Sequence, residues 1–222
     1  MKTFAEKAVK FFAGLNKPKK LPGETDLINP YINEDVRIVM SQFFKKYFDD
    51  NRERIFIIGI NPGRFGGGLT GISFTDPIAL KEECGIDNNL GKQKELSSKF
   101  IYKFINAYGG PAKFYSKCFI TALYPMAIIK YGKNFNYYDT VSLYKTLKPH
   151  IVESLCEQVK LGAKRDFAIC LGKKNATYLN EINNEHSFFK EIRVLDHPRY
   201  IMQYRLKRVY DYIDQYISAT GK

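Results

Sequence analysis

The fold of this chain is organised around residues 57–74, which read IIGINPGRFGGGLTGISF. Their first residues continue an apolar run over 54–60, and its β-branched side chains are typical of a strand buried on both faces. Asn61-Pro62-Gly63 ends that run with a rigid turn, and the aromatic residue Phe74 follows thirteen residues after the asparagine. We therefore expect a buried strand with a glycine-rich loop at its carboxyl end, where a ligand can approach the backbone closely.

Strands and helices alternate along the rest of the chain. Apolar spacing predicts helices over 4–15, 33–48, 92–108, 137–160, 173–182 and 201–217, and further buried strands within 114–123, 165–172 and 188–198. Residues 16–31 contain three prolines and are expected to form a loop, and Pro149 is expected to kink or divide its helix. The alternation predicts a three-layer α/β/α fold with a central, mainly parallel four-stranded sheet, in one domain over residues 1–222.

Sheets of this kind bind ligands at the carboxyl ends of their strands. Four loops follow the predicted strands there, at 61–74, 121–125, 172–175 and 197–199. They bring together the amide of Asn61, the ring of Phe74, a helix N-terminus beside Lys173 and Lys174, and the imidazole of His197. We expect these groups to share one site.

The same loops exclude several kinds of chemistry. They hold no pair of carboxylates of the sort that glycoside hydrolases use, and no G-K-S/T follows the glycines, as a P-loop requires. The four cysteines are widely spaced, so a structural zinc or iron–sulfur site is not expected. The sequence predicts a protein with neither a metal nor a cofactor.

The charge balance favours an anionic partner. Lysine and arginine total 35 against 23 acidic residues, for a formal net charge of +12, and nucleic acid is the commonest large polyanion. The alternative is a generally basic surface with no partner. No apolar run approaches the roughly 20 residues that span a bilayer, and the N-terminus lacks the apolar core of a signal peptide. We expect a cytoplasmic monomer without membrane contacts.

A family resemblance is carried mainly by residues 59–74, GINPGRFGGGLTGISF. This segment resembles the first motif of the single-strand-selective monofunctional uracil-DNA glycosylases, G-x-N-P-G-x-F-G followed by T-G and Phe. CFITALYPM at 118–126 resembles the family's second-strand segment, and DHP at 196–198 resembles its His-Pro motif. The resemblance implies a glycosylase that flips a damaged nucleotide into a pocket and cuts its N-glycosidic bond.

Site roles follow from that resemblance. Asn61 would hold the attacking water, Phe74 would stack on the extruded base, and His197 would donate a hydrogen bond to a carbonyl oxygen of the departing base. Pro62 and Gly63 would shape the turn, with backbone amides near the base or a phosphate. Each side chain also has a structural interpretation that stays open here: turn former for the asparagine, core residue for the phenylalanine and helix cap for the histidine.

The chain departs from the family where the base is read. The family usually carries an asparagine after its second strand, and this chain has Ala122 there. Thr121, beside it, offers one hydroxyl but no bidentate amide. Loss of such a contact should relax selectivity, so the base is left open between uracil and another deaminated or oxidised base.

Contacts with DNA are expected at two further places. A helix N-terminus at Lys173, Lys174 and Asn175 is suited to a phosphate, although a solvated basic turn is an equal alternative. After the His-Pro motif the family inserts a wedge into DNA, and cations beside an apolar wedge are the expected combination. The wedge candidates are Tyr200, Ile201 and Met202, flanked by Arg199 and Arg205 as phosphate contacts.

The sequence thus predicts a monofunctional DNA glycosylase that removes uracil or a related damaged base from DNA, single-stranded or damaged, and leaves an abasic site. Two alternatives remain. The substitution at Ala122 suits a module that binds single-stranded nucleic acid without catalysis. A weaker third possibility is a hydrolase of free nucleosides or nucleotides.

Overall fold

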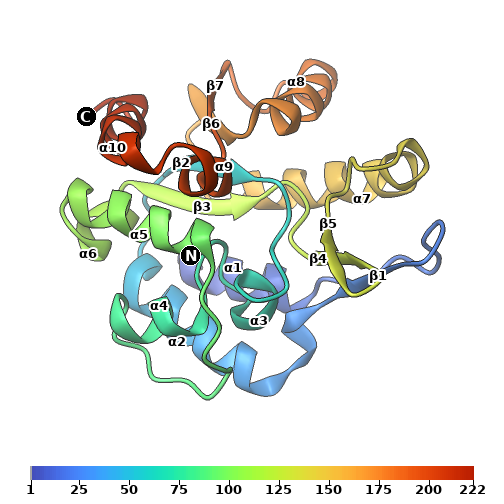
Figure 1. The fold of residues 1–222 in the computed structure, drawn as a ribbon, viewed down its shortest axis with the longest axis horizontal. Coiled ribbons are helices and arrows are strands. Elements are labelled where there is room, and N and C mark those ends of the chain that lie inside the picture. The colour runs from blue at the N-terminus through green and yellow to red at the C-terminus, as the bar shows by residue number, and fades with distance from the viewer. Residues whose placement is uncertain (1) are drawn as a thin grey trace.

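A four-stranded parallel sheet forms the centre of the computed structural model, which describes residues 2–222 (Figure 1). Its strands are β2 (Ile55–Gly59), β3 (Cys118–Ala122), β6 (Phe167–Leu171) and β7 (Glu191–Leu195). Their order across the sheet is β3-β2-β6-β7, and every neighbouring pair is parallel. The chain therefore leaves β2 in one direction for β3 and returns past it to β6. The carboxyl ends of β2 and β6 consequently flank the point where the strand order reverses, which is where open α/β sheets bind ligands.

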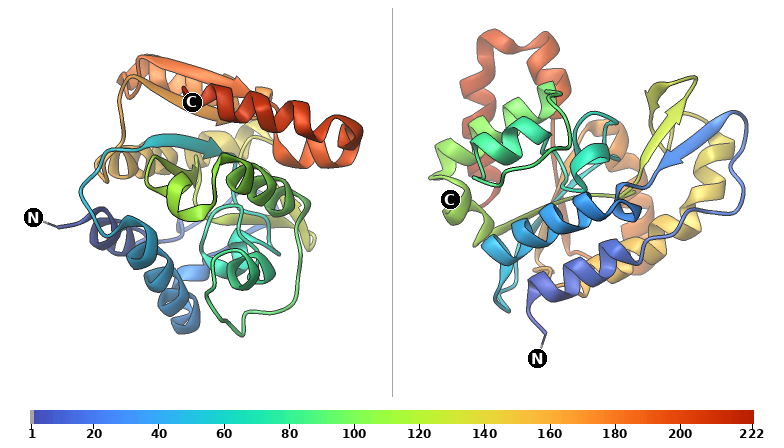
Figure 2. Two further views of the ribbon diagram at one scale, coloured as in Figure 1. Left: turned by 90° about the vertical axis from the view of Figure 1, so that its left-hand side faces the viewer. Right: turned by 90° about the horizontal axis from the view of Figure 1, so that it is seen from below.

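Helices cover both faces of this sheet (Figure 2), which confirms the predicted α/β/α arrangement. The longer helices are α1 (Phe4–Ala13), α2 (Glu34–Phe48), α5 (Leu96–Tyr108), α7 (Val141–Val159), α8 (Lys173–His186) and α10 (Val209–Ala219). The shorter ones are α3 (Gly67–Thr70), α4 (Pro77–Glu82), α6 (Pro111–Tyr115) and α9 (Pro198–Tyr204). Helices α1, α7 and α8 lie on one face, and α5, α9 and α10 lie on the other.

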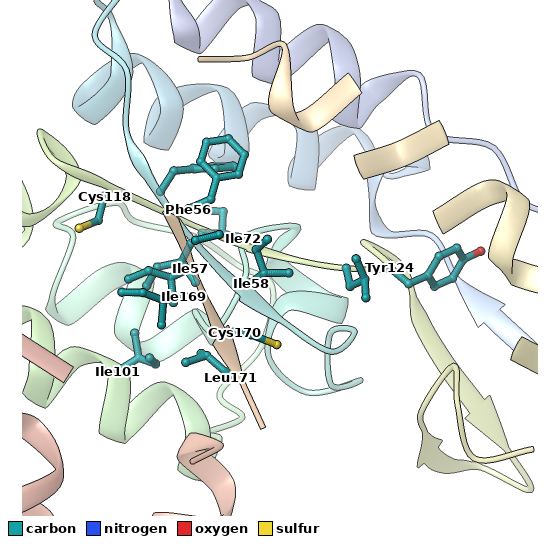
Figure 3. Close-up of a cluster of buried hydrophobic side chains, with 14 of the residues drawn as sticks. Phe56, Ile57, Ile58, Ile72, Ile101, Cys118, Tyr124, Ile169, Cys170 and Leu171 are labelled. Carbon is teal, nitrogen blue, oxygen red and sulfur yellow. The ribbon is translucent and has the colours of Figure 1, made fainter. Parts of the chain in front are cut away.

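The core lies on both sides of β2, whose five residues are all buried. Ile57 pairs with Ile120 of β3 and with Ile169 of β6, so aliphatic side chains line up across the sheet (Figure 3). The opposite face carries aromatic rings, and Phe56 lies 5.0 Å from Phe119 between ring centroids. Strands buried on both faces read as continuous apolar runs, which is why this part of the fold was predictable.

A second, smaller sheet was not predicted. It contains β1 (Thr25–Ile28), β4 (Ala127–Lys130) and β5 (Lys133–Phe135), in the antiparallel order β1-β4-β5. The expectation of a plain loop over 16–31 is therefore wrong, because β1 and a 3₁₀ turn at Pro30–Ile32 lie within it. Tyr131 and Gly132 join β4 to β5 with φ angles of 50° and 68°, the positive values that a two-residue type I′ hairpin requires.

The C-terminal helix also differs from its prediction. The expected helix over 201–217 is divided into α9, a 3₁₀ turn at Leu206–Arg208 and α10, because Arg205 leaves the helical conformation with φ −132° and ψ 24°. Tyr204, whose spacing from Ile201 would place it on the apolar face of one continuous helix, is 66% exposed. By contrast α7 runs without interruption through Pro149, so that proline does not divide the helix.

The buried side chain of Arg54 connects the start of β2 to the surrounding helices. The Arg54 guanidinium is fully buried, donates to both oxygens of Asp50 at 2.8 and 3.0 Å, and donates from Nε to the Tyr115 carbonyl oxygen at 2.8 Å. It also lies over the rings of Phe4 and Phe48, 4.9 and 4.8 Å from their centroids. These contacts tie β2 to α1, α2 and α6, and they hold the pKa of Asp50 below its ordinary value.

We expect Asp50→Asn to lower the free energy of unfolding by about 1–3 kcal/mol at pH 7, because it leaves the buried guanidinium without its counter-charge. A carboxyl group whose pKa is lowered by folding stabilises the folded state above its unfolded pKa of about 3.9, and that contribution disappears as the pH falls through the folded value. Urea denaturation should therefore show a smaller difference from wild type at pH 3. The exposed neighbour Asp49→Asn is the control, and equal effects of the two substitutions at pH 7 would contradict this assignment.

Candidate functional site

A cavity of about 330 Å³ opens at the carboxyl ends of the parallel strands. The loops that follow β2 and β7 contribute to its wall, as does Ala122 at the end of β3, whereas none of residues 172–175 after β6 does. Seven of the residues singled out from the sequence line it: Asn61, Pro62, Gly63, Phe74, Ala122, His197 and Arg199. Its size falls at the lower end of the range of about 300–1,000 Å³ typical of small-molecule sites.

The amide of Asn61 has a fixed orientation. Its Nδ2 donates to the Phe135 carbonyl oxygen at 3.0 Å, and its Oδ1 accepts from the Tyr137 backbone N–H at 3.2 Å. Both partners lie in the segment that leaves the small sheet at the end of β5. Nδ2 also donates to the Pro62 carbonyl oxygen at 3.5 Å. Since an amide offers two donors and two lone pairs, these bonds leave one lone pair of Oδ1 for a ligand.

The ring of Phe74 lies against the end of β2. A Cβ on Gly59 would come 2.5 Å from the Phe74 Cε2 atom, so the strand has to end in glycine for the ring to occupy this position. Phe74 itself has a φ of +55°, which is unusual for a residue with a side chain. The turn that imposes it is fixed by the Thr70 hydroxyl, which donates to the Thr75 carbonyl oxygen at 2.6 Å. The Phe74 ring centroid lies 5.6 Å from that of His197.

His197 combines two roles that the sequence left as alternatives. It is the N-cap of α9, where its Nδ1 accepts the Arg199 backbone N–H at 3.2 Å, and it also lines the cavity. Burial, helped by the positive charge of Arg199, lowers the pKa of the imidazole to about 4. The ring is therefore neutral at pH 7. Because Nδ1 accepts a hydrogen bond, the single ring proton is on Nε2, which is left as a donor.

Several cavity residues were missed by sequence reasoning. They are Ile60, Lys94, Glu95, Leu96, Ser97, Asn134, Asn136 and Gln203, whereas Phe65, Gly67 and Ser73 belong to the loop 61–74 that was expected at the site. The two asparagines lie in and just after β5, and the Tyr131-Gly132 turn was an available signal for that hairpin. Lys94 and Glu95 precede α5, and no motif marks them.

Thr121 does not reach the cavity, so its expected role as a base contact is wrong. Its side chain is fully buried, and its hydroxyl donates to Oε1 of Gln158 on α7. Alternate residues of a strand face opposite sides of the sheet, and Thr121 points toward the α7 face. Ala122, the next residue, does line the cavity and presents only a methyl group there.

Asn175 is likewise unavailable to a phosphate, which corrects the expectation for this helix N-terminus. Its side chain is fully buried, accepts from the Tyr137 hydroxyl at 2.7 Å, and donates to the carbonyl oxygens of Ile58 and Leu171 at 3.3 Å. Lys173 and Lys174 are exposed at the start of α8, so only these two members of the predicted group face solvent.

The expected wedge is also corrected in part. Ile201 is fully buried and Met202 is 7% exposed, because both lie on the inner face of α9. Tyr200 is 36% exposed and neighbours the exposed Tyr204, with 5.6 Å between ring centroids. The guanidinium of Arg205 lies 5.1 Å from the Tyr200 ring centroid. The exposed aromatic group on this helix is therefore a pair of tyrosines beside a cation.

Within residues 2–222, no three metal-ligating side chains come together as a potential metal site. In the same part of the chain, every helix is too short or too polar to cross a bilayer.

Comparisons with known proteins identify relatives of this chain. A family model described as the uracil DNA glycosylase superfamily matches residues 45–220. The structure is similar to the crystal structure of wild-type Pedobacter heparinus SMUG2, with a TM-score of 0.95 and 42% sequence identity, over 100% of this chain and 98% of that chain. A search of curated proteins found no match.

We expect His197 to titrate far below the ordinary range of histidine. In ¹⁵N–¹H spectra that follow the imidazole nitrogens, it should be neutral at pH 7 with the proton on Nε2, and its midpoint should lie near pH 4. The chain has three histidines, and a His197→Gln variant identifies the relevant signals. A midpoint above pH 6 would show that the ring is not desolvated as described.

Proposed function

Because the chain belongs to the uracil DNA glycosylase superfamily, we propose that it is a monofunctional DNA glycosylase. It hydrolyses the N-glycosidic bond of uracil or a related damaged base that has been flipped out of DNA, and leaves an abasic site in base excision repair.

One observation carries this proposal: Asn61 and Phe74, from the loop 61–74, line the same cavity as His197, which is more than 120 residues further along the chain. An amide, an aromatic face and a neutral imidazole are the groups that hydrolysis of a base–sugar bond needs.

Bond breaking is helped from the side of the base. The flipped base stacks on Phe74, which contributes about 1–3 kcal/mol to binding. As the bond between C1′ and the base nitrogen lengthens, its electron pair moves onto the base and the sugar becomes oxocarbenium-like. The Nε2–H of His197 donates to a carbonyl oxygen on which that negative charge grows, a contribution of about 3–4 kcal/mol if it matches an oxyanion-hole donor.

The sugar is captured by water from the side of Asn61. The free lone pair of its Oδ1 accepts a water proton and so directs the water oxygen toward C1′. The water oxygen forms the new bond to C1′ and loses one proton to solvent, while the departing base takes up one proton. Because an oxocarbenium-like carbon is highly electrophilic, an orienting amide suffices in place of a carboxylate base.

DNA would approach across the exposed cations around the cavity. Arg199 lines the cavity, Arg205 and Tyr200 extend from α9, and Lys173 and Lys174 lie at the start of α8. The net charge of +12 adds a long-range attraction to the phosphate backbone.

We expect Asn61→Ala to lower the single-turnover rate of base release by about 100-fold or more, because the attacking water loses its orientation. The assay uses single- and double-stranded oligonucleotides that contain uracil, xanthine, hypoxanthine or 5-hydroxymethyluracil, followed by alkali to cleave the abasic product. Asn180→Ala, on the exposed side of α8, is the matched control.

Other results of this assay would contradict the proposal. Strand cleavage before alkali, with borohydride trapping to Lys94 in the cavity, would indicate a lyase instead of a monofunctional enzyme. Tight binding with no base released from any oligonucleotide would favour the non-catalytic binding module. Faster release from free nucleosides than from DNA would favour a nucleoside hydrolase.

We expect Lys173→Ala to weaken DNA binding at every sequence and to reduce the slope of log K against log salt concentration by about one, as loss of one phosphate contact predicts. Fluorescence anisotropy between 50 and 200 mM salt measures the slope. Lys45→Ala is the control, because this exposed lysine lies in the last turn of α2, which leads to the opposite edge of the sheet. Equal slopes for the two variants would exclude Lys173 from the interface.

A further inference from the structure

A carboxylate faces the glycine-rich loop from the start of α5. Glu95 is the N-cap residue of this helix, yet its side chain caps no helical N–H. Its backbone N–H donates to Oδ2 of Asp76 at 2.9 Å, which fixes where the residue sits. The side chain therefore does not accept a hydrogen bond from the first turn of the helix, as an N-cap side chain usually does, and instead it lines the cavity.

Both oxygens of this carboxylate lie where two glycines leave room. A Cβ on Gly63 would come 2.2 Å from Oε1, and a Cβ on Gly66 would come 2.3 Å from Oε2. The backbone N–H groups of Phe65 and Gly66 favour the ionised form of the carboxylate and so lower its pKa, while the Gly66 N–H donates to the Gly63 carbonyl oxygen at 3.3 Å. The carboxylate thus occupies a cradle that any larger residue at these two positions would fill.

Charged and polar groups around the cavity shift the pKa of this carboxylate in opposite directions, and burial raises it. Burial and the nearby Asp76 raise the pKa of Glu95, while the loop N–H groups and Arg199 lower it. Arg199 also supplies the backbone N–H that holds Nδ1 of His197. Glu95 and Arg199 line the same cavity as Asn61.

We propose that Glu95 is a positioning residue that holds the segment Gly63–Gly66, so that Asn61, two residues before that segment, keeps its place at the cavity. This inference rests on the proposed glycosylase function for its effect on rate. A role as acid–base catalyst is the competing assignment, and the experiment separates the two.

The test is a double-mutant cycle between Gly63→Ala and Glu95→Ala. In the wild-type background the new methyl group overlaps Oε1, displaces the carboxylate and should lower base release by about 10–100-fold. Glu95→Ala alone should give a loss of similar size. With the carboxylate already absent, Gly63→Ala should cause little further loss, because the overlap is gone. Glu82→Ala, an exposed residue of α4, is the control.

Two further measurements keep the proposal falsifiable. Glu95→Gln, which retains one acceptor oxygen, should recover part of the lost rate with the pH profile of the wild type. The side-chain NH₂ signals of Asn61 in ¹⁵N–¹H spectra should shift in Glu95→Ala and not in Glu82→Ala. That second readout needs no activity, so a wild-type protein that releases no base would refute the proposed function alone.

The proposal is overturned by additive losses in the cycle, by wild-type rates for Glu95→Ala, or by unchanged Asn61 signals. A glutamine variant as slow as the alanine variant, with an altered pH profile, would also overturn it and would assign acid–base catalysis to the carboxylate.

Discussion

The parallel pairing of β2 with a strand on each side is the constraint on which the rest of the structure depends. Ile57 meets Ile120 of β3 and Ile169 of β6, so the carboxyl ends of all three strands reach the same edge of the sheet. The loops that follow must start there, whatever their length. The cavity is a consequence of this register, because strands in the opposite direction would have sent those loops to opposite edges.

Much of the fold and the centre of the site could be predicted for this reason. Buried parallel strands are continuous apolar runs, and the helices between them show clear spacing, so the sequence alone indicates the order of elements. Once the sheet is parallel, Asn61, Phe74 and His197 belong to loops at one edge. The fold prediction is confirmed by the structure and by its similarity to SMUG2 of Pedobacter heparinus.

The remaining errors have local physical causes. Successive residues of a strand face opposite sides of the sheet, and the sequence does not show whether Thr121 or Ala122 faces the cavity. In the same way, the side of α9 that packs on the protein determines that Ile201 is buried. Strands of three or four residues, as in the hairpin at 127–135, are too short for an apolar period to register. Glu95 approaches the loop only through tertiary packing, which no local pattern encodes.

The amide of Asn61 is the first member of a chain of hydrogen bonds that returns to β2, the strand that precedes it. Its oxygen accepts from the Tyr137 backbone, the Tyr137 hydroxyl donates to Asn175, and Asn175 donates to Ile58, three residues before Asn61 in the chain. Tyr137, Asn175 and Ile58 are fully buried, so the backbone that orients the amide is itself held by hydrogen bonds that water cannot replace. In the proposed reaction, an incoming nucleotide would meet an amide dipole whose direction is already set, so little reorganisation energy would be spent there.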